Sequence, residues 1–134
     1  MATVNINTDR VFKDLDLNFN IHPVKKDINT HSNEYAVINA VKNLVLTQHY
    51  EKPFHPEIGS QVRSMLFENV DSIVASRLER ALAEVIDNYE PRASVSQIVA
   101  TPAPEENGYK VELEFYILNL TDPVNITFFL ERIR

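Results

Sequence analysis

The sequence predicts an α+β domain in which two to three helices pack on a small antiparallel sheet. Two observations lead to this prediction. Apolar residues recur at three- and four-residue spacings between residues 32 and 89, whereas they alternate with polar residues from residue 92 onwards. Helices that precede a strand meander in the chain typically pack on one face of the sheet that those strands form.

The length and composition fit a single hydrophobic core. The chain has 134 residues, of which 44% are hydrophobic and 24% are charged, close to the average for globular domains. Chains of about 100 to 150 residues close one core and rarely divide into two. We therefore expect a single domain over residues 31–134, preceded by an extended N-terminal arm over residues 1–30.

The N-terminal arm keeps neither a helical nor a strand period over its length, which is why an extended arm is expected. A short two-residue period inside it would lay one apolar edge on the domain or, alternatively, on a neighbouring molecule, with local packing favoured. The alternating residues are Asp14, Asp16 and Asn18 on one side and Leu15, Leu17 and Phe19 on the other.

Three segments carry the helical spacing. The first covers about Ser32–Gln48, with Ser32 or Asn33 as its cap, and the second is a short helix within Ser60–Asn69. The third is the longest: Asp71 is its expected N-cap, and Pro91 prevents its extension. The apolar stripe of the first helix is Val37, Val41, Leu44 and Val45, and that of the third is Val74, Leu78, Ala81, Leu82, Val85 and Tyr89.

A loop with two prolines separates the first two helices, over residues 51–59. Pro53 and Pro56 fix their own φ angles and disfavour helix at the residue before each of them. The loop lacks a Ser/Gly-rich tract, so we expect an ordered loop rather than a flexible linker. Its apolar residues, Phe54 and Ile58, either anchor the loop in the core or form a surface that faces a partner.

Two-residue alternation predicts a C-terminal three-stranded meander. The first strand alternates around Val95, Gln97 and Val99, the second follows Gly108, and the third follows a turn at residues 119–123. One face of the second strand carries Tyr109, Val111, Leu113, Phe115 and Ile117, and one face of the third carries Val124, Ile126, Phe128 and Leu130. No later segment is expected to cover the outer edge of the third strand, and an open edge invites strand addition by a partner.

The composition argues against several classes of function. The formal net charge is −6 without a dense Lys/Arg block, so neither a nucleic-acid nor a membrane partner is expected. The lack of cysteine excludes disulfides, thiol catalysis and thiolate zinc sites. Two glycines are too few for a phosphate-binding loop. We expect neither cofactor nor metal, and, because no signal peptide precedes the domain, a protein made and kept inside a cell.

A glycoside hydrolase is the enzyme class that deserves a test, because it needs only two suitably spaced carboxylates. Glu57, Glu68 and Glu90 lie near loops or helix ends. However, 19 acidic residues make such positions common, and the chain has no tryptophan on which a sugar could stack. The four histidines show no metal-ligand spacing. We expect no catalytic residue.

Glu90, Pro91 and Arg92 follow the longest helix. Proline makes the residue before it extended, so the two charged side chains are expected to project to similar sides. Taken by itself, this arrangement favours a helix stop with a solvated ion pair worth ~0 to 1 kcal/mol. The alternative is a rigid charged fork that docks on a partner.

At these residues the sequence resembles the lysozyme-like baseplate wedge family, which includes the T-even gene product twenty-five and its type VI secretion relatives. The family signature is Glu-Pro-Arg, here at 90–92. The segment Lys52–Gly59 is similar to the family's Arg-Pro-Phe-x-Pro-Glu-aromatic-Gly, and Leu66–Asn69 follows at a similar distance. The segments Asp14–Phe19 and Ile38–Leu44 also resemble phage members. Lys52 and Ile58 depart from the pattern, and lysine cannot pair bidentately as arginine does.

The resemblance implies a structural, non-enzymatic baseplate wedge subunit of a contractile phage tail, located in the virion and made in the host cytoplasm. It implies docking on a helical core bundle of other wedge subunits and initiation of the tail sheath. Tail tube and hub proteins are further candidate partners. The implied core-bundle contacts are Glu90, Pro91 and Arg92, and the implied sheath-facing strand carries Val124, Ile126, Phe128 and Leu130. A cell-wall muramidase, suggested by the family's lysozyme label, is the alternative function.

Overall fold

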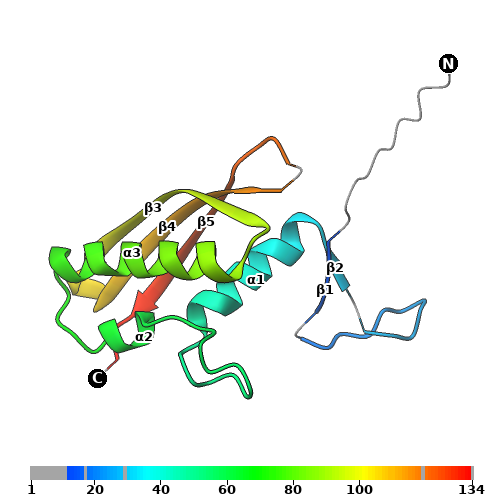
Figure 1. Cartoon of the computed structure of the whole chain (residues 1–134), viewed down its shortest axis with the longest axis horizontal. Helices are drawn as coiled ribbons and strands as arrows, with labels where there is room; N and C mark the ends of the chain where they lie inside the picture. The colour runs from blue at the N-terminus through cyan, green and yellow to red at the C-terminus, as the bar shows by residue number, and fades with distance from the viewer. Residues whose placement is uncertain (1–11, 17, 29, 119, 134) are drawn as a thin grey trace.

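A computed structural model describes residues 12–16, 18–28, 30–118 and 120–133. It confirms the predicted α+β fold (Figure 1). The elements, in chain order, are β1 (Lys13–Leu15), β2 (Thr30–Ser32), α1 (Glu34–Leu46), α2 (Val62–Met65), α3 (Ser72–Tyr89), β3 (Ala93–Ala103), the 3-10 turn η1 (Pro104–Glu106), β4 (Gly108–Ile117) and β5 (Val124–Glu131).

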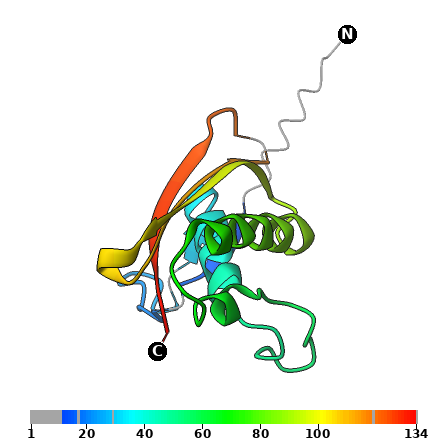
Figure 2. The same cartoon turned by 90° about the vertical axis from the view of Figure 1, so that its left-hand side faces the viewer.

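The predicted C-terminal meander is the main sheet of the molecule. Its strands are antiparallel in the order β3-β4-β5, and the helices lie on one side of it (Figures 1 and 2). The predicted alternation of β4 is confirmed, since Tyr109, Val111, Leu113, Phe115 and Ile117 are each at most 2% exposed. The central strand therefore supplies a continuous apolar ridge on which α1 and α3 pack.

Helix α3 begins as its sequence predicts. The side chain of Asp71 accepts hydrogen bonds from the N–H groups of Ile73 and Val74, at 2.9 and 2.8 Å, which satisfies two donors that the helix leaves unpaired. The buried stripe is wider than predicted because Ala75 and Ile86 join it. Each lies next in sequence to a predicted stripe residue, Val74 or Val85, and is buried with it.

Helix α1 buries Ala36, Val37, Val41 and Val45. Of the two expected cap residues, Asn33 is the N-cap, with a φ of 53° and no side-chain capping hydrogen bond. Its N–H instead donates to the Phe12 carbonyl at 2.7 Å. The backbone here is shaped by the preceding hairpin rather than by a local cap.

The predicted alternation of β3 is wrong after Val95. The register with β4 shifts between Val95 and Gln97, which marks a β-bulge. The extra residue inverts the phase, so that Ile98 packs against the core and Ala100 is 6% exposed. An inserted residue of this kind leaves no strong signal in a run of alternating small and polar residues.

The N-terminal arm folds back on itself instead of staying extended. Strands β1 and β2 pair antiparallel, and an isolated bridge joins Ile21 to Ile28. The favoured local packing of the apolar edge on the domain is also wrong: Leu15 and Phe19 are 59% and 63% exposed, whereas Asp16 is 5% exposed. The acidic side of the alternation faces the domain. Leu17 and residues 1–11 lie outside the described residues.

Candidate partner-docking site

Glu90, Pro91 and Arg92 form the turn between α3 and β3. Glu90 is the C-cap residue of α3, and its N–H donates to the Ile86 carbonyl at 2.9 Å. Pro91 has no N–H and cannot continue the helix. The Ala93 N–H donates back to the Glu90 carbonyl at 3.1 Å. This turn sets the two charged side chains on the same side, as the sequence predicts.

Arg92 and Glu90 make a two-pronged ion pair. Arg92 Nε donates to Glu90 Oε1 at 2.8 Å, and Nη2 donates to Oε2 at 2.7 Å. The Glu90 side chain is only 7% exposed and that of Arg92 is 23% exposed. The interpretation as a solvated ion pair is therefore wrong, because burial removes the solvent screening that makes surface pairs weak.

Arg92 also binds a second carboxylate that the sequence analysis did not find. Its Nη1 and Nη2 donate to Asp14 Oδ1 and Oδ2 at 3.3 and 3.2 Å. The guanidinium carbon lies 5.5 Å from the centroid of the Phe12 ring, a cation–π distance. The pKa of Arg92 is raised above its usual range, mainly by its hydrogen bonds to Glu90. Burial of the guanidinium group opposes this rise, and the hydrogen bonds to Asp14 add to it. Arg92 therefore stays positively charged.

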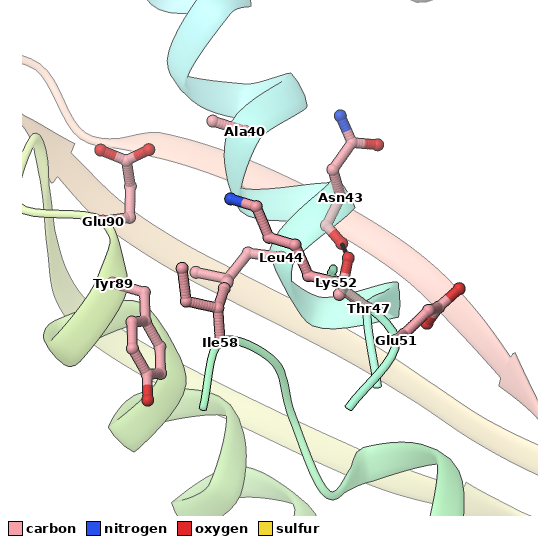
Figure 3. Close-up of a pocket in the computed structure, with 9 residues that line it drawn as sticks. All are labelled: Ala40, Asn43, Leu44, Thr47, Glu51, Lys52, Ile58, Tyr89 and Glu90. Atoms are coloured by element: carbon pink, nitrogen blue, oxygen red, sulfur yellow. Dashed lines mark hydrogen bonds between the residues drawn. The ribbon is translucent and has the colours of Figure 1, made fainter. Parts of the chain in front are cut away.

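An open cavity of about 480 Å³ lies beside this cluster. Glu90 and Tyr89 form one wall, Ala40 and Leu44 of α1 form the floor, and the proline loop closes the far side (Figure 3). The ammonium group of Lys52 points into the space between α1 and Glu90 (Figure 3). Lys52 is the position where the family commonly has arginine, so this departure from the family pattern lies at the site.

The proline loop is ordered and held by several hydrogen bonds. Tyr89 Oη donates to the Glu57 carbonyl at 2.7 Å, which ties the loop to the end of α3. Gly59 has a φ of +142°, and a Cβ there would stand 2.7 Å from the Gln48 carbonyl carbon, so only glycine closes the loop. Phe54 is 97% exposed, so its assignment as a core anchor is wrong. Ile58 is partly buried and lines the cavity.

The side chains expected to face the sheath point into the protein's own core. Val124, Ile126 and Leu130 are 8%, 8% and 3% exposed, and Phe128 packs against both core clusters. These side chains are engaged in the core, and Phe128 is only partly exposed. What β5 offers instead is its backbone and its opposite face.

The outer edge of β5 carries unpaired backbone groups at alternate residues. The Arg132 N–H donates to the Asn107 carbonyl at 2.8 Å, in register with the β4–β5 ladder. Residues opposite one another in an antiparallel pair alternate between bonded and non-bonded pairs. The N–H and C=O groups directed away from β4 are therefore those of Asn125, Thr127, Phe129 and Glu131.

The other edge of the sheet is protected. The Ala100 N–H of β3 points away from β4 and donates to Glu79 Oε1 of α3 at 2.8 Å. Helix α3 runs along this strand (Figure 1), and the Glu79 side chain of this helix occupies an N–H group that an incoming strand would need. The two edges therefore differ: β3 is covered, whereas for β5 the described residues include no side chain that caps the outward groups.

The carboxylates considered for a hydrolase are engaged elsewhere. Arg77 Nη1 binds both oxygens of Glu68, at 3.0 and 2.8 Å, and Arg92 binds both oxygens of Glu90. The pKa of Glu57 is lowered, mainly by a hydrogen bond from its own backbone and then by His55, whereas a general acid needs a raised pKa. Within the described ranges, neither a cluster of three potential metal ligands nor a membrane-spanning helix is found.

Comparisons with known proteins agree with the architecture. Residues 31–119 match the family model described as baseplate wedge protein gp25. The baseplate wedge protein gp25 of Enterobacteria phage T4 is 25% identical over 118 residues, which cover 88% of this chain and 89% of that protein.

Two solved structures share the fold. A chain of the anti-feeding prophage baseplate superposes with a TM-score of 0.72 at 18% identity, over 84% of this chain and 90% of that chain. A Geobacter sulfurreducens protein, provisionally described as a tail lysozyme, gives a TM-score of 0.69 at 16% identity, over 75% of this chain and 92% of its own. Identities this low show a common fold and do not transfer an activity. Because the family model matches more than half of the 134 residues, the chain belongs to the baseplate wedge protein gp25 family.

Proposed function

We propose that the protein is a structural, non-enzymatic wedge subunit of a contractile-tail baseplate, and that it links the wedge to the first layer of the sheath. Family membership supports the baseplate role. The site around Glu90, Pro91 and Arg92 docks on a helical bundle of other wedge subunits. The open edge of β5 receives a strand of the sheath protein.

The observation that carries the sheath part of this proposal is the asymmetry of the two sheet edges. Glu79 accepts from the outward N–H of Ala100 in β3, whereas the N–H and C=O groups of Asn125, Thr127, Phe129 and Glu131 in β5 point away from β4. Exposed edges promote unwanted pairing and are normally protected. An edge left open beside a covered one is typical of a protein that takes up a partner strand.

The non-enzymatic part rests on the engaged carboxylates. A muramidase needs one protonated carboxyl group and one free carboxylate facing a sugar cleft. Glu68 and Glu90 are each bound on both oxygens by an arginine. Hydrolysis of purified cell wall by the wild-type protein, lost on Glu90→Gln, would contradict this proposal and establish the alternative.

Deleting β5 would be a poor test, since its side chains fill the core. A better variant is Thr127→Pro, which removes one outward N–H and leaves the bonds to β4 intact, because proline is tolerated where an edge N–H faces solvent. We expect the variant to enter the baseplate normally and to start few sheaths, as counted by electron microscopy of reconstituted particles. Thr127→Val keeps the N–H and should behave as wild type.

Normal sheath assembly by folded Thr127→Pro would contradict strand addition at this edge. Failure of both Thr127 variants would indicate that the outer face of β5, rather than its backbone, is the contact. Circular dichroism and thermal unfolding of the isolated proteins verify that each variant is folded before assembly is scored.

A further inference from the structure

We propose that Asp14 is a third member of the Glu90–Arg92 site, a positioning residue that clamps the N-terminal hairpin, residues 12–32, onto the domain. The hairpin thereby becomes one wall of the docking surface. The role of the hairpin in docking rests on the proposed function. The clamp does not, because it can be tested on the isolated chain.

The clamp follows from how the guanidinium group of Arg92 is shared. Its Nε edge is bound by Glu90, which comes from the end of α3, and its terminal Nη1–Nη2 edge is bound by Asp14, which comes from β1. Arginine presents its donors in a fixed planar fork, so binding on one edge fixes the direction of the other. Glu90 therefore orients Arg92, and Arg92 orients the hairpin.

The described residues of the hairpin bury little apolar surface. Leu15, Phe19, Ile21 and Val24 are between 59% and 82% exposed, so its apolar residues contribute little burial against the domain. Further attachments near β1 include the packing of Phe12 on the core cluster, the hydrogen bond from the Asn33 N–H to the Phe12 carbonyl, and the burial of Asp16. Each involves a residue close to Asp14 in the sequence, Phe12 or Asp16. An element that buries few apolar side chains opens locally at lower free energy than the core, so a bidentate contact to a charged group adds substantially to its retention.

The hairpin completes a groove across α1. A second cavity, of about 590 Å³, lies between β1 and α1, and it shares Ala40 and Asn43 with the cavity beside Glu90. The two cavities thus border the same two residues, Ala40 and Asn43, on the outer side of α1. Hairpin residues line the second cavity, whereas the proline loop and Glu90 line the first.

The occupant we assign is one helix of the wedge core bundle. A small floor residue such as Ala40 lets another helix approach closely, since the distance between helix axes depends on the side chains at the contact. Asn39, Asn43 and Asn18 line the groove with amide groups. That helix should therefore present hydrogen-bonding side chains rather than an apolar stripe.

The clamp is tested by hydrogen exchange on the full chain with Asp14→Asn, which keeps the shape of the side chain and removes its charge. We expect the amides of β1, β2 and Asn33 to exchange about tenfold faster or more, because a hydrogen bond to a charged group is lost. Asp14→Glu retains the carboxylate and should restore much of the protection. Asp27→Asn is the matched control, since this exposed hairpin carboxylate bonds only its neighbour Ile28 in the described hydrogen-bond network.

Unchanged exchange in Asp14→Asn would overturn the clamp, whatever the role of the motif in docking. The groove is tested by incorporation into wedges, where we expect Asp14→Asn and Ala40→Arg to be impaired and Ser76→Arg, a similar change on the exposed side of α3, to be normal. If the hairpin loosens but both variants incorporate normally, the hairpin is not part of the docking surface. Normal incorporation of Arg92→Ala would instead refute the proposed function of the motif itself.

Discussion

At the scale of single residues, the strongest constraints come from buried polar groups with defined partners. Tyr109 has a fully buried ring, its hydroxyl donates to the Asn69 carbonyl at 3.1 Å, and it accepts from the Asp71 N–H at 3.2 Å. One side chain of β4 thus fixes the loop from which α3 starts. Burial is the main cause that raises the pKa of Tyr109 above its ordinary value.

This raised pKa predicts a loss of stability in alkali. Tyr109 stays protonated in the folded chain at pH values where the unfolded chain ionises it, at about 10. Its contribution is complete below that pH and is lost as the pH rises through the higher folded value. The free energy of unfolding, measured with urea from pH 8 to 11, should therefore fall less steeply in Tyr109→Phe. That variant should also lose about 1 kcal/mol at pH 8; equal slopes in both proteins would contradict the assignment.

At the scale of elements, the sequence predicts those whose burial is periodic and local. Helix α3 and strand β4 have uninterrupted stripes, so their spacing alone identifies their buried faces. The bulge in β3 and the folding back of the arm escaped prediction for different reasons. The bulge depends on one inserted residue, and the hairpin depends on a contact between Asp14 and Arg92, 78 residues apart. The candidate site was predicted in part. Pro91 predicts that Glu90 and Arg92 lie on the same side, but the sequence pattern predicts neither the burial of this pair nor the contact of Arg92 with Asp14.

The start of α3 gives a test at this scale. Asp71→Ala removes the acceptor for the N–H groups of Ile73 and Val74. We expect a loss of about 1 kcal/mol in the free energy of unfolding, within the range of roughly 0.5 to 2 kcal/mol for N-cap removal. Ser72→Ala, at the adjacent exposed position, is the control and should change stability by less than about 0.5 kcal/mol. An effect of equal size in both variants would show that helix propensity, not capping, is being measured.

At the scale of the whole molecule, assembly depends on which surfaces are left open. The sheet has a free edge at β5 and a covered edge at β3, and the docking groove lies on the helical side. In the proposed function, the wedge bundle and the sheath strand therefore bind without competing for one surface. The covered edge matters as much as the open one, because a sheet with two open edges would add strands in both directions and form chains of molecules.

Glu79→Ala tests this view of the covered edge. The substitution removes the acceptor of the Ala100 N–H, which should cost about 1 to 3 kcal/mol and expose a second pairing edge. We expect concentration-dependent self-association in sedimentation velocity, whereas Glu84→Ala, an exposed carboxylate on the same helix, should leave the oligomeric state unchanged. Combining Glu79→Ala with Thr127→Pro should reverse the association, because growth needs both edges. If Glu79→Ala stays as monodisperse as wild type, the bulk of α3 rather than its carboxylate protects β3, and the bulged strand itself prevents pairing.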